Sequence, residues 1–188
     1  MTALARRGSI ALACLAYLLG AAPAAAASLD AFFGSYVGVA EVQNGFGEVV
    51  ERRDMDIVIS PFQSRGFQIR WVNVTLVDGR RDLPGVERRI AEVVFEPRDG
   101  SGFFTEGHEV DPFTSREEIK PMAGDPVRWA KLDDDGLHVF SFVVLPDGAY
   151  ELHTYTRHLT DVGLNLLFER VVDGVMVRRI EGRTVRAD

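Results

Sequence analysis

Residues 137–159 read LHVFSFVVLPDGAYELHTYTRHL, which is two runs of β-branched and aromatic residues on either side of a Pro-Asp-Gly turn. Short runs of this composition, bounded by turn residues, are typical of β-strands. An Asp-Gly pair between two such runs favours a tight turn, because both residues tolerate a positive φ. The stretch therefore predicts two antiparallel strands joined as a hairpin.

The same pattern recurs along most of the chain. From Ser28 onward, no apolar repeat of 3.6 residues is long enough to predict a helix. Asn-Gly or Asp-Gly pairs separate many of the apolar runs, at 44–45, 78–79, 99–100, 135–136, 147–148 and 173–174. The strands that we expect are 35–43, 48–60, 67–77, 86–96, 102–106, 127–132, 137–145, 149–159, 164–172 and 175–186.

Eight to ten strands of this kind, with few helices to cover them, must bury their apolar faces against one another. The composition, 46% hydrophobic and 26% charged over 188 residues, is that of one globular domain. The sequence therefore predicts an all-β fold, built as an antiparallel barrel or sandwich.

The first 27 residues have the features of a cleaved signal peptide. Arg6 and Arg7 precede an apolar run at 10–19, and small residues follow at 21–27. The apolar run is far shorter than the roughly 20 residues that a membrane-spanning helix needs. Cleavage would leave a single domain, 28–188, in the periplasm or secreted from the cell.

The overall charge narrows the range of partners. The chain has 28 acidic residues against 21 Lys and Arg, a net charge of −7, and loss of the leader with its two arginines would make it −9. A protein this acidic repels phosphate backbones and anionic lipid head groups. We therefore expect no nucleic-acid partner and no electrostatic docking on a membrane. We also expect no membrane span in the mature chain.

One long loop interrupts the strand pattern. It runs from 107 to 126 and holds Pro112, Pro121 and Pro126. Ser115 could cap a short helical turn within this loop. Loops of this length inside a compact domain often serve as a lid, a rim or a contact for a partner.

No catalytic or metal-binding constellation stands out in the sequence. The G-x-S-x-G motif is absent, and the only cysteine, Cys14, lies in the leader. His153 and His158 are five residues apart, which would place them on opposite faces of a strand. We therefore expect no enzyme activity, no metal and no other cofactor.

Two short segments resemble the lipocalin-like (calycin) barrels. FGSYVG at 33–38 is similar to the G-x-aromatic-x-G opening of their first strand, and RTVR at 183–186 is similar to the end of their closing strand. The resemblance implies an up-and-down barrel with an internal cavity for a small apolar ligand. It also implies that Arg186, or failing that Arg183, lies over Tyr36. Haem-binding relatives use a histidine motif that none of the four histidines matches, so the resemblance adds no cofactor.

The turn at 147–148 predicts which residues face the barrel interior. A two-residue turn would set Ser141 opposite Thr154, on a face without charges, whereas the other face carries Glu151 and Arg157. We expect the uncharged face inside, because burying an unpaired ion costs several kcal/mol. Such an interior suits a neutral or weakly polar ligand better than an anion. The candidate ligand-binding residues, which include both tryptophans, are Trp71, Trp129, Ser141, Tyr150, Thr154 and Thr156.

The turn at 173–174 sets a second register in the same way. A two-residue Asp-Gly loop pairs Val172 with Val175. Counting back from that pair, Glu169 would lie opposite Arg178.

The run at 67–77 changes its apolar phase in the middle. Apolar residues occupy odd positions up to Trp71 and even positions after it. This change indicates either a β-bulge near Trp71 or a strand that is apolar on both faces.

Together, these observations favour an exported antiparallel β-barrel that binds a small, mostly apolar ligand without catalysis. The alternative is a structural or protein-interaction domain whose interior is filled by side chains and which acts through the 107–126 loop. A cavity inside the barrel would favour the first hypothesis. The sequence does not identify a protein partner.

Overall fold

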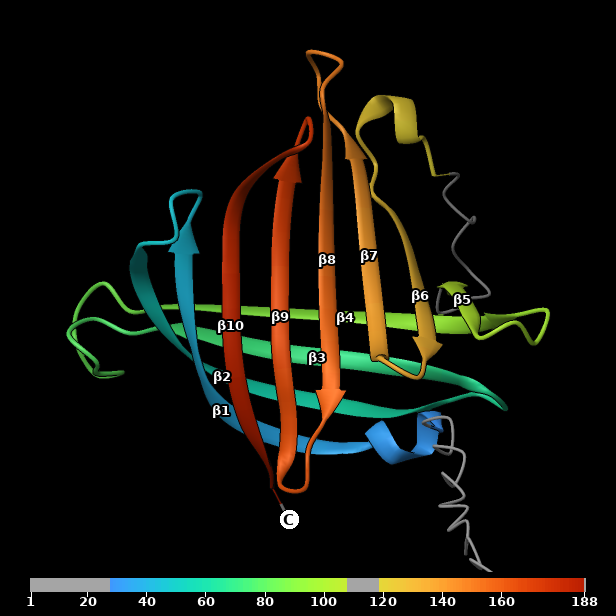
Figure 1. Cartoon of the computed structure of the whole chain (residues 1–188), viewed down its shortest axis with the longest axis horizontal. Helices are drawn as coiled ribbons and strands as arrows, with labels where there is room; N and C mark the ends of the chain where they lie inside the picture. The colour runs from blue at the N-terminus through green and yellow to red at the C-terminus, as the bar shows by residue number, and fades with distance from the viewer. Residues whose placement is uncertain (1–27, 108–118, 188) are drawn as a thin grey trace, which may run out of the picture.

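The computed structural model describes residues 28–107 and 119–187, which form one closed barrel of ten antiparallel strands. Each strand is hydrogen-bonded to its neighbours in sequence, and β1 pairs with β10 to close the wall (Figure 1). No helix in these two ranges is long and apolar enough to cross a membrane. The strands are β1 (Gly34–Asn44), β2 (Val49–Phe62), β3 (Gly66–Thr75), β4 (Glu87–Arg98), β5 (Phe103–Glu106), β6 (Val127–Asp133), β7 (Gly136–Val144), β8 (Tyr150–Leu159), β9 (Gly163–Val172) and β10 (Val175–Ala187), and the 3-10 helices are η1 (Leu29–Phe32) and η2 (Pro121–Ala123).

The all-β, antiparallel, up-and-down architecture is therefore confirmed, with each strand close to its predicted bounds. Two predicted features lie outside the described residues. They are the leader at 1–27 and the part of the long loop at 108–118, which contains the turn expected at Ser115.

One end of the barrel is filled by the main hydrophobic core. Phe67 packs in parallel against Phe95 and edge-on against Phe104, with ring centroids 5.0 Å apart in both pairs. Phe32, from η1, is fully buried in the same cluster. Because each large apolar side chain contributes about 1.5 to 3 kcal/mol when buried, this end provides much of the fold's stability.

Arg186 and Tyr36 connect the last strand to the first, as the lipocalin-like resemblance implied. The Arg186 guanidinium lies 5.2 Å from the centroid of the Tyr36 ring and donates a hydrogen bond of 2.9 Å to the Tyr36 hydroxyl. It also donates to the carbonyl oxygens of Ala31 and Phe33. The Tyr36 hydroxyl in turn donates to the Phe32 carbonyl at 2.9 Å. One side chain thus holds β10, β1 and η1 together.

The predicted register between β7 and β8 is wrong by one residue. The turn has three residues, with Leu145 and Ala149 paired across it, and Ser141 lies opposite His153 instead of Thr154. Gly148 has a φ of +86°, the left-handed conformation that ends a three-residue hairpin loop. Pro146 has no N–H to donate to a neighbouring strand, which favours its inclusion in the turn.

The register between β9 and β10 begins as predicted and then shifts. Val172 pairs with Val175, but a bulge between Met176 and Arg178 adds one residue to β10. Glu169 consequently lies opposite Arg179, and Arg178 lies opposite Arg170. The prediction that Glu169 faces Arg178 is therefore wrong.

No bulge interrupts β3 at Trp71. Its pairing with β2 and with β4 is continuous from Phe67 to Thr75. Ile69 and Val72 are both buried although they lie on opposite faces of the strand. Of the two alternatives, the strand that is apolar on both faces is the one that the structure contains.

Candidate functional site

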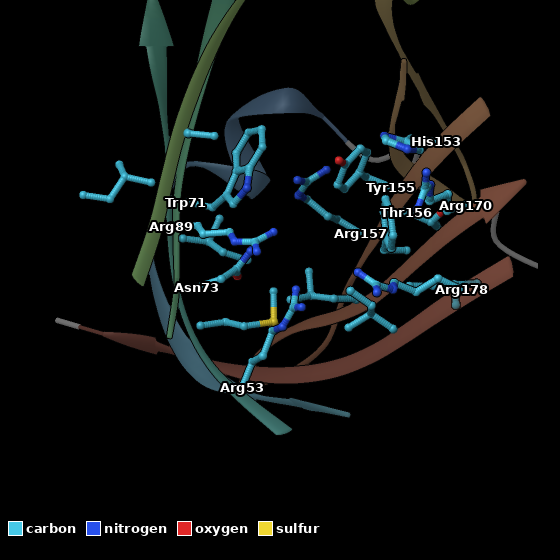
Figure 2. Close-up of a pocket in the computed structure, with 18 of the residues that line it drawn as sticks. Arg53, Trp71, Asn73, Arg89, His153, Tyr155, Thr156, Arg157, Arg170 and Arg178 are labelled. Atoms are coloured by element: carbon cyan, nitrogen blue, oxygen red, sulfur yellow. The ribbon is translucent and has the colours of Figure 1, made fainter. Parts of the chain in front are cut away.

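A cavity of about 450 Å³ lies inside the barrel, beyond the phenylalanine core (Figure 2). Volumes of this size are typical of pockets for small-molecule ligands. Its wall combines aromatic and aliphatic side chains with an unusual number of arginines. It is lined by Arg53, Met55, Ile57, Trp71, Asn73, Arg89, Ile90, Ala91, Glu151, His153, Tyr155, Thr156, Arg157, Leu166, Leu167, Phe168, Arg170, Arg178 and Ile180.

The cavity is positively charged although the protein as a whole is acidic. Five of the lining residues are arginines and one, Glu151, is an acid, whereas the whole chain has a net charge of −7. A low-dielectric cavity lined by one sign of charge attracts ligands of the opposite sign. The interior is therefore suited to an anion.

Alternation along β8 brings charged and aromatic side chains to the same inner face. His153, Tyr155 and Arg157 occupy every second position and all line the cavity. Tyr155 packs against Phe168 on β9 at 4.7 Å between centroids, and against Trp71 on β3 at 6.0 Å. Burial raises the pKa of the Tyr155 hydroxyl, which keeps it neutral. An aromatic layer therefore crosses the middle of the cavity.

Arg157 is the least satisfied polar group of this wall. Its exposed fraction is 5%, and its Nε and Nη1 atoms have no hydrogen-bond partner among the described residues. The guanidinium carbon lies 5.9 Å from the centroid of the Tyr155 ring, and the side chain points into the cavity between Trp71 and Tyr155 (Figure 2). Burial lowers the pKa of Arg157 to about 10, below the usual value for arginine. Arg157 is thus a buried cation with unused donors that face the cavity.

Glu151 is the centre of a small ionic network near the β7–β8 turn, at the end of the cavity farther from the phenylalanine core, which we call the mouth. Its carboxylate accepts a hydrogen bond of 2.5 Å from Arg170 and also contacts the His153 ring. The hydrogen bond from Arg170 is the main reason why the pKa of Glu151 is lowered. Burial lowers the pKa of His153, which favours its neutral form. The Nε atom of Arg170 and the Oδ1 atom of Asn73 are buried without a partner among residues 28–107 and 119–187.

Arg53 is satisfied in a different way. It is buried, with an exposed fraction of 8%, and forms an ion pair with Glu51. Thr75 donates a second hydrogen bond to the same carboxylate. Hydrogen bonding from Arg53 lowers the pKa of Glu51, so the pair is charged and compensated at neutral pH. Arg157 therefore differs from Arg53 in having no ion pair with an acid among residues 28–107 and 119–187.

The structure brings only some of the predicted site residues to the cavity. Trp71 lines it, and so does Thr156, whose hydroxyl shares a hydrogen bond of 3.2 Å with the His138 ring. Ser141 is buried on the inner face. The other three residues point away from the interior. Trp129 stacks on Phe140 and Tyr150 stacks on Phe142, both on the outer face of the barrel. Thr154 lies opposite Phe140 on the same outer face.

The assignment of the uncharged β8 face to the interior is therefore wrong. The one-residue shift turns His153, Tyr155 and Arg157 inward and Thr154 outward. Burying an ion is costly, which favours the reverse assignment, yet the cavity is lined by five arginines. The sequence signal that would have identified these residues is Pro146, which favours the longer turn.

Metal binding finds no support in the described ranges. Among residues 28–107 and 119–187, no three His, Cys, Asp or Glu side chains come together in a cluster that could hold a metal ion. The charged side chains of the cavity are instead mainly guanidinium donors, which suit the oxygen atoms of a carboxylate, sulfate or phosphate.

Comparison with known proteins identifies no family. No family model matches the sequence, and no curated protein matches it. Among solved structures, the chain is similar to the S-type phycobiliprotein lyase CPES from Guillardia theta, with 13% sequence identity and a TM-score of 0.49 over 85% of this chain and 90% of that chain. The function of this protein must therefore be argued from the residues of its own cavity.

Proposed function

We propose that this barrel is a binding protein for a small molecule that has an apolar, partly aromatic body and an anionic group. The ligand is held in the cavity without chemical change. The anionic group lies at Arg157, and the body packs against Trp71, Tyr155 and Phe168. This proposal revises the neutral ligand expected from the sequence, because the charged face of β8 lines the interior.

The observation that carries the proposal is that two buried guanidinium nitrogens of Arg157, Nε and Nη1, have no hydrogen-bond partner in the described part of the chain. A buried charge without a partner costs several kcal/mol, and natural proteins pair nearly all such groups. The described residues provide no acid for Arg157, whereas Arg53 and Arg170 in the same cavity each have one. An anion from outside the chain would supply the missing acceptor.

The rest of the wall supports a ligand with an apolar body. Met55, Leu166 and Ile180 line the cavity beside the three aromatic rings. A volume of about 450 Å³ is enough for a ligand of drug-like size. An interior of this volume also favours ligand binding over the alternative of a packed barrel that acts through the 107–126 loop.

We also propose that the protein acts outside the cytoplasm, after removal of residues 1–27. The support is the leader sequence, with its paired arginines, short apolar run and small residues before Ser28. Intact-mass measurement of the protein isolated from its host tests this point. A mass that still includes residues 1–27 in the exported fraction would contradict it.

The binding proposal can be tested with two fluorescent probes of nearly the same shape. Anilinonaphthalene sulfonate carries an aromatic body and one anionic group, and N-phenylnaphthylamine has the same kind of body without charge. We expect the sulfonate to bind at a single site about 10- to 100-fold more tightly, because a charge-assisted hydrogen bond contributes about 1.5 to 3 kcal/mol. Arg157→Met should remove this preference.

Arg88→Gln is the matched control, because it removes one positive charge from an exposed position on β4. This variant should keep the preference for the sulfonate. Equal affinities of the wild-type protein for the two probes would overturn the proposal. The same holds if Arg157→Met keeps the full preference while circular dichroism shows an intact fold.

A further inference from the structure

The inner faces of β8 and β9 carry a second arginine at a fixed distance from the first. Arg157 lies opposite Leu166, and His153 lies opposite Arg170, so the two arginine positions are four residues apart along the paired strands. At about 3.3 Å per residue, this separation is about 13 Å. The pair of Tyr155 and Phe168 occupies the level between them. The cavity therefore has a cationic layer on each side of an aromatic layer.

The cationic layer near the mouth is formed by two arginines that face each other on neighbouring strands. Arg170 and Arg178 are cross-strand neighbours on β9 and β10, and both line the cavity. Like charges in this position destabilise a sheet. They are brought together by the bulge between Met176 and Arg178, without which a different side chain would face Arg170.

The acids nearby leave part of this layer uncompensated. Glu151 pairs with Arg170 through one guanidinium nitrogen, while the Nε atom of Arg170 is buried without a partner. Arg178 forms no ion pair within 4.0 Å with any acid in the described part of the chain. Arg178 contributes to the lowered pKa of Glu51, but the Glu51 carboxylate already accepts hydrogen bonds from Arg53 and Thr75. An anion between Arg170 and Arg178 would use the free donors and relieve the repulsion.

We infer that the ligand carries two anionic groups, one at each end of its apolar body. The first group binds Arg157 in the depth of the cavity, and the second binds Arg170 and Arg178 at the mouth. This inference rests on the proposed function and narrows its ligand to a diacid whose acid groups are separated by roughly the length of the aromatic layer.

A series of straight-chain dicarboxylic acids, from octanedioic to hexadecanedioic acid, tests the inference. Each diacid is compared with the monocarboxylic acid of the same carbon number. Binding is followed by the fluorescence of Trp71 in a Trp129→Phe background, which leaves one tryptophan, at the cavity. We expect one range of chain lengths in which the diacid binds about tenfold more tightly than the monoacid, since the second carboxylate gains charge-assisted hydrogen bonds.

Arg178→Gln should remove the advantage of the diacid over the monoacid. Arg179→Gln is the matched control, because Arg179 is the next residue of β10 and is engaged with Glu181 and Glu169 instead of the cavity. This control should keep the advantage.

The two proposals fail in different ways. If monoacids bind in a manner that depends on Arg157 and diacids bind no better at any length, the second anionic site is refuted and the proposed function stands. If neither class binds, the proposed function fails with it. An advantage of the diacid that survives Arg178→Gln would also refute the site at the mouth.

Discussion

Replacement of Arg157 by methionine should make the empty protein more stable. Burial lowers the pKa of Arg157 to about 10, which means that the fold disfavours the charged guanidinium by about 3 kcal/mol. Arginine remains protonated at neutral pH in both the folded and the unfolded chain, so this whole penalty is present there. Methionine carries no charge and fills most of the same space next to Tyr155.

The expected net gain is smaller than the full penalty, because methionine leaves some volume unfilled. Allowing about 1 kcal/mol for that loss gives a gain of about 2 kcal/mol in the free energy of unfolding, which for a domain of this size raises Tm by about 4 to 8 °C. Urea denaturation followed by far-ultraviolet circular dichroism measures it. Arg88→Met, at an exposed position, should change stability by no more than about 0.5 kcal/mol.

The pH dependence gives an independent check of the same argument. Between the folded pKa of about 10 and the higher pKa of arginine in the unfolded chain, the unfolded chain binds more protons than the folded one at this residue, so the stability of the wild type increases with rising pH there. The difference between Arg157→Met and the wild type should therefore narrow above about pH 10. A variant less stable than the wild type by more than about 1 kcal/mol at neutral pH would refute the reasoning, because it would mean that the guanidinium is satisfied in the empty protein.

Three further perturbations test the fold. Arg186→Ala removes the hydrogen bonds to Ala31, Phe33 and Tyr36 together with the contact on the Tyr36 ring. It should lower the free energy of unfolding, measured by urea titration, by about 2 to 4 kcal/mol. Arg183→Ala, at an exposed position of the same strand, should have little effect. The pKa of Asp133 is lowered to about 2, mainly by its hydrogen bond from Lys131, so its contribution to stability is present above about pH 4 and is lost as the pH falls toward 2. Asp133→Asn should therefore reduce the loss of unfolding free energy that urea titrations measure between about pH 6 and pH 3. An unchanged dependence of stability on acid pH would contradict this assignment. Gly38→Ala would place a methyl group 2.0 Å from the Arg183 carbonyl oxygen, a backbone atom that cannot move aside, and should lower soluble yield and urea midpoint sharply, while Ser35→Ala, at an exposed position of the same strand, should resemble the wild type in both measurements.

The sequence contains enough information for the architecture. Strand bounds follow from short β-branched and aromatic runs, and turns such as Asp173-Gly174, with φ values of +46° and +80°, follow from residues that tolerate the left-handed conformation. The contact between Arg186 and Tyr36 also follows, because it depends on which strands meet and hardly on the details of their register. These features are local or topological.

The cavity was harder to predict because its residues depend on register. A side chain changes face when the pairing slips by one position, and two such slips occur, one at the Pro146 turn and one at the bulge before Arg178. The distribution of charge on β8 favoured the wrong face for the interior, because an unpaired arginine such as Arg157 is normally exposed to solvent. The residues that break the ordinary rule of burial are those that now define the candidate site.

The phenylalanine core at one end of the barrel adjoins the arginine-lined cavity: Met55, Ile57, Trp71, Tyr155 and Leu166 belong to both, whereas Phe67 and Phe95 belong only to the core and Arg170 and Arg178 only to the cavity. Residues that belong only to the cavity can therefore be substituted without disturbing the residues that belong only to the core. Exchanges at Asn73, Arg170 or Arg178 would change the shape and charge of the cavity while Phe67, Phe95 and the Arg186 clamp continue to hold the chain together. A library of variants restricted to these cavity positions should consequently retain a high proportion of folded members.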